Sequence, residues 1–318
     1  MISCKICNEE YSNDKSFHAH LKKHNIYQAE YYCTHYPRKS LYYKEQIPFR
    51  NKKEYFETEF LDKLEFEMWE RSSSKETVRN KCLEILEKRI SEKNYIYAPF
   101  HNELLTLNLP EISIYKKHFG SYSAACKLLN KEPLFNMNIP KNFNDVNLRN
   151  KEILIDTREQ DPLTFAKYKV EKLYVGDYLL NDGNYSYTFV DRKSENDFLG
   201  TLASGVERFD REIERACGLG AYLFVVIESS IDQIIDNHKK YKRKTNLEYV
   251  FHNMRHLTHK YPRHVQFVFT GSRNKSVDII PKILYHGKSL WQVDIQYFID
   301  HELGNWQSET KKELSNQQ

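Results

Sequence analysis

The sequence lacks the features that mark several large classes of protein. Its 318 residues include only 10 glycines and 9 prolines, and they contain no low-complexity segment and no long-period repeat. The 6 cysteines are too few and too scattered for a disulfide scaffold of this length. No apolar run approaches the roughly 18 residues of a transmembrane helix, and the N-terminus lacks the apolar stretch of a secretory signal. We therefore expect a cytoplasmic protein without a membrane partner.

A strong excess of charge of one sign is also lacking. Lys and Arg number 48 against 44 Asp and Glu, which leaves a net charge of only +4. This balance is too mild to indicate a nucleic-acid partner by itself, so any basic surface must be a local patch. Hydrophobic residues at 40% and aromatic residues at 14% are sufficient for a real core, and the length allows two or three domains.

The composition and the hydrophobic periodicity of the sequence change along its length, which predicts several domains. Its middle is polar, aromatic and charged with helical periodicity, whereas its last half alternates strand-like apolar runs with helical patterns. We divide the chain into a Cys/His unit at 1–26, a helical DNA-binding region at 27–135, a linker rich in Asn and Pro at 136–150, an α/β domain at 151–303 and a polar tail at 304–318.

Local patterns predict the main helices and strands. Ser73-x-x-Glu76 is typical of a capping box before a helix at about 75–91, and Gly120-Ser121 separates two short helices. In the last domain we expect strands at 152–156, 178–180, 185–191, 222–227 and 265–269, and helices at 198–216, 246–261 and 277–284. Strands that alternate with helices predict a sheet covered on both faces.

Two cysteines and two histidines near the N-terminus have the spacing of a structural zinc site. The pattern is Cys4-x2-Cys7-x12-His20-x3-His24, four ligands of the types that tetrahedral Zn²⁺ prefers. Tyr11 and Phe17 fall where a small ββα unit needs its core aromatics. Such a unit is too short to fold without a metal, so ligands and core must agree. The alternative is a chance coincidence of two Cys and two His.

This stretch resembles the two-Cys/two-His zinc fingers over its full length. The resemblance implies that Asn13, Ser16 and Ala19 face DNA and that Lys22 and Lys23 reach phosphates. One finger reads only about three base pairs, so it cannot specify a site alone. The alternative is a finger that only folds the N-terminus or contacts a protein partner. Because the ligand set is complete, we expect His18 and the Cys33/His35 pair not to be ligands.

A second candidate site lies at a predicted hairpin. Asp177 and Asp191 are about equally far from the turn near residue 184, so a simple register places their Cβ atoms about 5 Å apart. Such carboxylates repel each other unless a divalent cation sits between them. Side chains alternate along a strand, so Asp191 and Lys193 share a face while Arg192 points away. Mg²⁺ or Mn²⁺ held by two carboxylates beside a Lys suits phosphodiester hydrolysis.

Two further carboxylates are placed to complete this site. Glu159 and Asp156 lie at the carboxyl end of the preceding predicted strand. We expect Glu159 to join Asp177 and Asp191 as a ligand of the divalent cation. The plain alternative is a surface hairpin decorated with ordinary charges, because the D-x-K pattern is very common on its own.

Three segments of the last domain resemble the XPF/Mus81-type nuclease domain, a branch of the PD-(D/E)XK nucleases. They are IDTRE (155–159), VGDY (175–178) and VDRKSENDF (190–198), and the likeness extends from Glu152 to about Asp300. The resemblance implies a restriction-endonuclease-like α/β fold. It also implies catalytic-site roles for Asp156, Arg158, Glu159, Asp177, Asp191, Arg192, Lys193 and Asp197.

The implied roles differ among these residues, and the sequence departs from the family pattern twice. Arg158 and Arg192 would be phosphate contacts or structural partners of the carboxylates, and Asp197 would hold Arg192 or Lys193. The glutamate of the family's ERK element is Asp191 here, a shorter carboxylate that still coordinates Mg²⁺. Relatives carry tandem helix-hairpin-helix motifs after the nuclease domain, for which this sequence leaves no room. We therefore expect other parts of the chain to engage DNA.

Two more stretches are candidates for DNA contact. Residues 110–133, PEISIYKKHFGSYSAACKLLNKEP, resemble the repeat associated with homing endonucleases, which implies phosphate contacts by Lys116, Lys117 and Lys127. The predicted loop 238–244 suits a backbone clamp with strong salt dependence. Its basic residues are Lys239, Lys240, Lys242, Arg243 and Lys244. The alternatives are an ordinary pair of helices and a solvated loop.

Together these patterns predict a metal-dependent DNA endonuclease with a zinc finger and a helical module. The domain combination is typical of a bacteriophage or mobile-element protein, which would act in the host cytoplasm. Homing-type double-strand cleavage is one expectation, and cleavage of branched DNA in recombination or repair is the other. The rival is a catalytically inactive DNA-binding regulator or scaffold. A third hypothesis is a nuclease subunit that needs a homodimer or a partner chain.

Overall fold

The chain divides into two compact units. The computed structural model describes residues 1–148, 150–183 and 186–301. The units are Met1–Lys81 and Cys82–Gln318, and their boundary falls inside the long helix α5 (Lys75–Lys93). Within the described part of the chain, no helix is long and apolar enough to cross a membrane.

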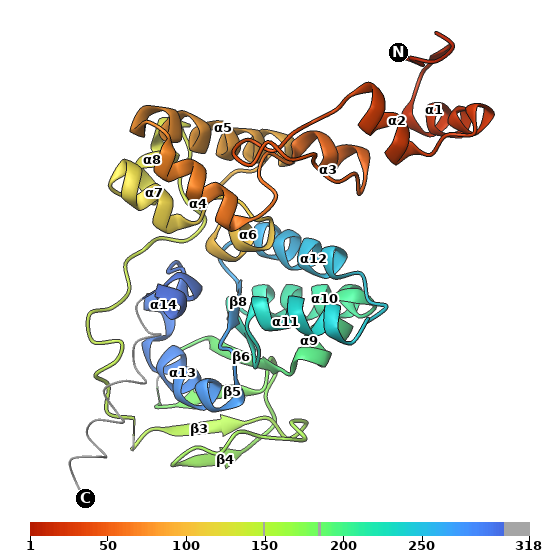
Figure 1. Ribbon diagram of the computed structural model, residues 1–318. Coiled ribbons are helices and arrows are strands. Elements are labelled where there is room, and N and C mark those ends of the chain that lie inside the picture. Colours follow the sequence, from red (N-terminus) through yellow and green to blue (C-terminus); the bar gives the residue numbers. More distant parts are fainter. Residues whose placement is uncertain (149, 184–185, 302–318) are drawn as a thin grey trace, which may run out of the picture. The chain divides into compact units, whose positions relative to one another are not determined.

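The first unit combines a small β-hairpin with short helices (Figure 1). Its elements are β1 (Ile2–Ser3), β2 (Glu10–Tyr11), α1 (Asp14–Leu21), the 3₁₀ helix η1 (Lys22–His24), α2 (Gln28–His35), α3 (Lys52–Glu57) and α4 (Lys63–Ser72). β1 pairs antiparallel with β2, so the N-terminal stretch has the ββα order of elements. Asn13, Asn51 and Asp62 cap α1, α3 and α4 by accepting backbone N–H groups.

One hydrophobic cluster joins the Cys/His stretch to the residues that follow it. Phe17 and Leu21 of α1 are buried together with Tyr31 and Tyr32 of α2 and Tyr55 of α3. The rings of Phe17 and Tyr31 meet edge to face, with 5.3 Å between centroids. The aromatic side chains after residue 26 therefore complete the core over which the Cys/His stretch folds.

Three short helices follow α5 in the second unit, and the first of them packs on the sheet domain. They are α6 (His101–Thr106), α7 (Ile112–Phe119) and α8 (Tyr122–Leu128). Gly120, with φ of +85°, ends α7, and Ser121 caps α8, as the sequence predicts. Asn102 Nδ2 donates to Phe267 O at 2.8 Å, which anchors α6 to the sheet.

A six-stranded mixed sheet forms the centre of the second unit. Its strands are β3 (Glu152–Ile155), β4 (Tyr168–Val170), β5 (Tyr178–Asn181), β6 (Thr188–Lys193), β7 (Tyr222–Ile227) and β8 (Val265–Phe269), in the order β4-β3-β5-β6-β7-β8. β5 is antiparallel to β3 and β6, whereas β6, β7 and β8 run parallel. Every residue of β7 is buried, as expected for a central parallel strand.

Helices cover both faces of this sheet, which confirms the predicted α/β architecture (Figure 1). On one face lie α9 (Glu195–Ala203), α10 (Val206–Gly218), α11 (Ile231–Lys240) and α12 (Leu247–Lys260). On the other lie α13 (Arg273–His286), the 3₁₀ helix η2 (Gly287–Leu290) and α14 (Ile295–His301). Apolar side chains of α9 to α12 form one cluster with β6, β7 and β8.

Three local predictions are wrong. The predicted capping box begins at Ser73, but the capping serine is Ser74. Its hydroxyl oxygen accepts a hydrogen bond from Thr77 N, because α5 begins at Lys75. The helix predicted at 198–216 is two helices, because Gly205 N turns back to Gly200 O and ends α9. The basic run 238–244 is not a loop throughout, since its first residues form the last turn of α11.

Candidate active site and metal-ligating clusters

Asp177 and Asp191 lie side by side at the open end of the β5–β6 hairpin. Tyr178 pairs with Val190, and Asp177 N donates to Val190 O at 2.8 Å, so the register brings Asp177 opposite Asp191. Asp191 is only 6% exposed. Burial, and then the charge of Asp191, raise the pKa of Asp177 well above its ordinary value, although Arg192 N donates to its carboxylate. The pair is therefore a place where a cation would relieve repulsion.

Gly176 allows the backbone to reach this position. Its φ is +63°, and a Cβ at this residue would lie 2.8 Å from Val190 O. A side chain would clash with the neighbouring strand, and the positive φ would add strain for any L residue. The glycine before Asp177 thus keeps the loop against β6 and directs the carboxylate toward Asp191.

Lys193 adds a cation to the carboxylate pair. Its Nζ lies 2.8 Å from Asp191 Oδ2 and 5.0 Å from the centroid of the Phe209 ring. Burial disfavours its charge, but Asp191, Asp177 and Glu212 outweigh burial and raise the pKa of Lys193. As a cation, Lys193 can hold a phosphate oxygen or orient water.

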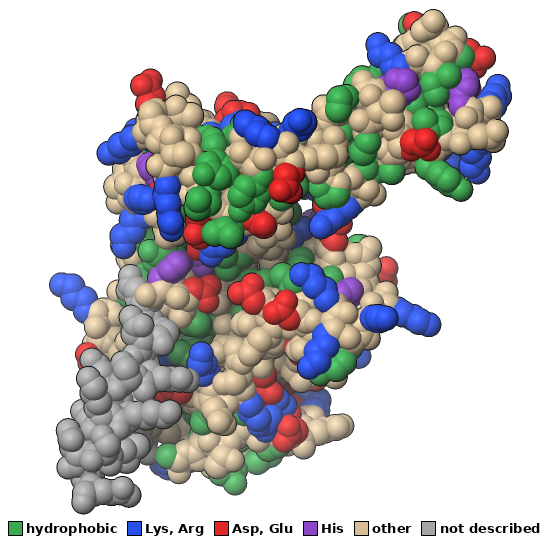
Figure 2. Space-filling model, in the orientation of Figure 1, with side chains coloured by type: hydrophobic (Ala, Val, Ile, Leu, Met, Phe, Trp, Pro, Cys, Tyr) green, Lys and Arg blue, Asp and Glu red, His purple; other side chains and the backbone are tan. Residues whose placement is uncertain are grey.

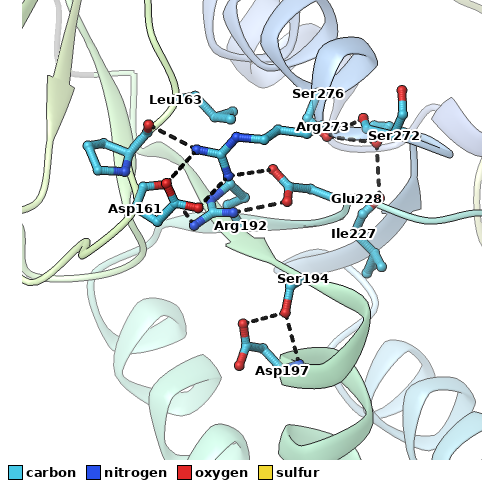
Figure 3. Close-up of polar contacts among 12 residues, drawn as sticks. Asp161, Leu163, Arg192, Ser194, Asp197, Ile227, Glu228, Ser272, Arg273 and Ser276 are labelled. Atoms are coloured by element: carbon cyan, nitrogen blue, oxygen red, sulfur yellow. Dashed lines mark hydrogen bonds and ion pairs between the residues drawn. The ribbon is translucent and has the colours of Figure 1, made fainter.

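Arg192 lies on the other side of β6 and is held by acids. Its guanidinium contacts Glu159 at 3.0 Å and Glu228 at 3.1 Å. Arg273, at the start of α13, contacts Glu228 at 3.4 Å and Asp161 at 2.9 Å, which ties the loop after β3 to the sheet (Figure 3). Of the two roles predicted for Arg192, this geometry favours that of a structural partner of the carboxylates.

Asp156 is engaged in holding a loop rather than facing the carboxylate pair. It is 1% exposed, and it accepts hydrogen bonds from Arg158 N and Nε, both at 2.7 Å, and from Leu173 N at 2.6 Å. Burial opposes its ionisation, yet these hydrogen bonds outweigh burial and lower the pKa of Asp156. Its oxygens are therefore occupied by the chain itself.

Asp197 does not hold Arg192 or Lys193, contrary to the prediction. It lies in the first turn of α9 and accepts a hydrogen bond from Ser194 Oγ at 2.6 Å. Figure 3 shows this pair apart from the contacts of Arg192. The physical reason is the turn of the helix, which directs a residue at this position back toward the N-cap.

Sequence reasoning missed two acids of this domain, one beside the carboxylate pair and one that holds Arg192. Glu212 lies on α10, where burial and then the charge of Asp191 raise its pKa. Glu212 follows the buried Phe209 by three residues, so both lie on one helix face, and this spacing is the signal that would have found it. Glu228 follows β7 directly, at the carboxyl end of a parallel strand, which is a common location for site residues in α/β sheets.

The Cys/His stretch gathers the ligand set that its spacing predicts. The Nε2 atoms of His20 and His24 lie 3.0 Å apart, with Cys7 Sγ at 3.2 Å from the first and Cys4 Sγ at 3.7 Å from the second. Two sulfur and two nitrogen donors fit a tetrahedral Zn²⁺. His18 instead lies against Tyr32, outside the set.

The carboxylate pair offers fewer ligands than the sequence predicts. Groups of three or more His, Cys, Asp or Glu side chains can hold a metal ion when their ligand atoms lie close together. Over the ranges 1–148, 150–183 and 186–301, the Cys/His set is the one such group whose ligand atoms all lie within 4.8 Å of one another. Glu159 does not join Asp177 and Asp191, because it faces Arg192. The two Asp side chains still provide the oxygen donors that Mg²⁺ or Mn²⁺ prefers, and burial, followed by the charge of Asp191, raises the pKa of Asp177.

All the lysines proposed for DNA contact are exposed, whereas the arginine proposed with them, Arg243, is partly buried. Exposed are Lys22, Lys23, Lys116, Lys117, Lys127, Lys239, Lys240, Lys242 and Lys244. Arg243 instead pairs with Glu195 at 2.9 Å. Asn13 Oδ1 accepts Ser16 N as the cap of α1, so that oxygen is already engaged. On the face in view, Figure 2 shows Lys and Arg dispersed among Asp and Glu.

Asp177→Asn should stabilise the protein in the absence of divalent cations. A carboxyl group whose pKa is raised on folding favours the folded state at acid pH, and this contribution is lost as the pH rises through the folded-state pKa. The variant should therefore unfold at a higher temperature than the wild type in EDTA at neutral pH, with the difference shrinking at acid pH. Thermal unfolding checks this, with the exposed Glu214→Gln as control. A lower midpoint for the variant at neutral pH would contradict the buried pair.

Comparison with known proteins finds one similarity to the region that holds this pair. The family model described as the ERCC4 domain matches residues 153–283, which include nearly all of the six-stranded sheet. Among solved structures, XPF from Aeropyrum pernix in complex with DNA has a TM-score of 0.34 and 16% identity over 43% of this chain and 65% of that chain. The chain thus spans less than two thirds of that relative. XPF from the same organism, in a second structure, has a TM-score of 0.32 and 18% identity, covering 43% of this chain and 67% of that chain. None of the curated proteins compared matches this chain.

Proposed function

We propose that the chain is a divalent-cation-dependent DNA endonuclease in which Asp177, Asp191 and Lys193 carry the cleavage. The observation that carries this proposal is the Asp177–Asp191 pair, in which Asp191 is buried, with the Lys193 ammonium 2.8 Å from Asp191, inside the residues that match the ERCC4 domain. The two carboxylates and the Lys193 ammonium lie next to each other at a site with little solvent. Electrostatic effects on a phosphodiester are strong at such a site.

Each residue has a separate part in this proposal. Asp177 and Asp191 would hold Mg²⁺ or Mn²⁺, which when bound neutralises phosphate charge and makes water a better nucleophile. Lys193 holds a phosphate oxygen or orients the attacking water. Arg158, whose side chain is 61% exposed, contacts a phosphate, and Arg192 keeps the loop that carries Glu159 in place.

We propose structured DNA, such as flaps, splayed arms or four-way junctions, as the substrate class. Homing-type cutting of one duplex sequence is the second candidate, and the two helices around Gly120-Ser121 favour it because they could add sequence-dependent contacts. In both cases Zn²⁺ held by the Cys/His set would fold the N-terminal stretch and present Lys22 and Lys23 to phosphates.

A cleavage panel tests the proposal. Labelled linear duplex, splayed arms, flaps and four-way junctions are incubated with the protein in Mg²⁺, with EDTA as control. Cutting at branches supports the structure-directed enzyme, and cutting of one duplex sequence supports the homing type. If the protein binds DNA but cuts nothing, the enzyme proposal is wrong as stated. An inactive scaffold or a missing partner chain would then explain the binding.

A further inference from the structure

The side chain of Tyr174 is exposed to solvent, although the residues on either side of it are buried. It is 83% exposed, whereas its neighbours Leu173 and Val175 are 6% and 1% exposed. Single exposed aromatic residues are common on protein surfaces, so exposure by itself indicates nothing. What distinguishes Tyr174 is how its backbone is held and what lies next to it.

The backbone on both sides of Tyr174 is held by hydrogen bonds. Leu173 N donates to Asp156 at 2.6 Å, and Leu173 O accepts from Arg158 Nη2 at 3.2 Å. On the other side, Gly176 lies against β6 and Asp177 N donates to the same strand at 2.8 Å. The ring is therefore carried by a preorganised frame, and a ligand that stacks on it orders little of the chain.

The backbone segment that carries Tyr174 also leads to the carboxylate pair. Tyr174 precedes Asp177 by three residues, a span of at most about 11 Å. Arg158 Nη2 donates to Leu173 O at 3.2 Å, so its guanidinium lies on the Tyr174 segment. In the described part of the chain, no group accepts a hydrogen bond from Arg158 Nη1, and this side chain is 61% exposed. An open donor and an open ring thus lie on the segment that leads to Asp177.

We infer that Tyr174 and Arg158 form a nucleotide subsite beside the carboxylate pair. In it, the Tyr174 ring stacks on an unpaired base and Arg158 Nη1 donates to a neighbouring phosphate. A ring can stack on a base only when that base has left its own stack, which occurs in single strands, flaps and ends. At about 3.4 Å per nucleotide of one strand, the span corresponds to about three steps. The subsite rests on the proposed function and deepens it, because it requires an unpaired nucleotide within that distance of the cut.

The first test compares Tyr174→Ala and Tyr174→Phe with the wild type on a flap and on a linear duplex of the same sequence. The ratio of kcat/KM for flap over duplex should fall roughly 5- to 100-fold in Tyr174→Ala, the effect expected for loss of one stacked base. Tyr174→Phe keeps the ring and should keep the ratio. Tyr249→Ala removes another exposed tyrosine, on α12, and serves as the matched control.

The second test measures stacking without cleavage. A flap carrying the fluorescent base 2-aminopurine at its junction is bound to Asp191→Ala protein, which is expected to bind without cutting. Quenching of the base should be present with Asp191→Ala and absent when Tyr174→Ala is added. A wild-type flap-to-duplex ratio in Tyr174→Ala, an equal loss on both substrates, or quenching without Tyr174 each overturns the subsite. If the wild type cuts no DNA, the proposed function fails, while the quenching result still decides the subsite.

Discussion

Asp191→Ala should cut DNA about a thousandfold more slowly than the wild type, or not at all, while it binds DNA nearly as well. The substitution removes one of two carboxylates proposed to hold the cation and the partner of Lys193. Asp191 is buried, so its loss takes no contact away from the exposed lysines proposed to bind phosphates. Lys193→Ala should have a similar effect, since it removes the ammonium that contacts Asp191 at 2.8 Å.

Single-turnover cleavage and equilibrium binding, measured on the best substrate of the panel, separate these effects. Glu214→Ala, an exposed acid on the same domain, should cut like the wild type. Thermal unfolding shows whether a variant is folded, and relief of the repulsion on Asp177 should keep Asp191→Ala folded. If folded Asp191→Ala cut at the wild-type rate, the proposed active site would be wrong.

Cys7→Ala should release one Zn²⁺ per chain and unfold the N-terminal stretch. Structural Zn²⁺ contributes an apparent binding free energy of about 10–16 kcal/mol in small domains, far more than a core of this size supplies. Loss of one of four ligands therefore removes the main source of its stability. Phe17 would then lose its place against Tyr31, and Lys22 and Lys23 would no longer be presented together. DNA affinity should fall.

Zinc content of the purified protein and proteolysis of the N-terminal stretch check this result. Cys33→Ala is the matched control, because Cys33 lies in the same unit but outside the ligand set. It should keep its Zn²⁺ and its resistance to protease. A Cys7→Ala protein that retained stoichiometric Zn²⁺ would show that the four residues do not form the site.

The hairpin pair was predictable because it depends on local rules. Side chains alternate along a strand, and residues equally far from a predicted hairpin turn are expected to face each other. These two rules place Asp177 opposite Asp191 and put Lys193 on the face of Asp191, as the structure has them. The Cys/His set was predictable for the same reason, since a short ββα unit leaves its ligands few arrangements.

The remaining acids were not predictable, because each has several partners within reach. Glu159 follows β3 at the right place for the site, yet it pairs with Arg192, which β6 supplies from the opposite face. Asp197 is directed to Ser194 by the first turn of its helix. Glu212 comes near Asp191 only because α10 packs over the sheet, a contact that is distant in sequence.

By itself, the sequence determined most strands of the sheet, the alternation along β6, the spacing of the Cys/His set and the pairing of Asp177 with Asp191, because these follow from neighbouring residues and from the burial of apolar runs. Only the tertiary structure decided which long charged side chains meet. The contacts of Arg192 with Glu159 and Glu228, and the exposure of Tyr174 to solvent, depend on packing between segments far apart in the chain. A flexible charged side chain takes whichever partner the packed fold brings within reach, and local sequence does not contain that information.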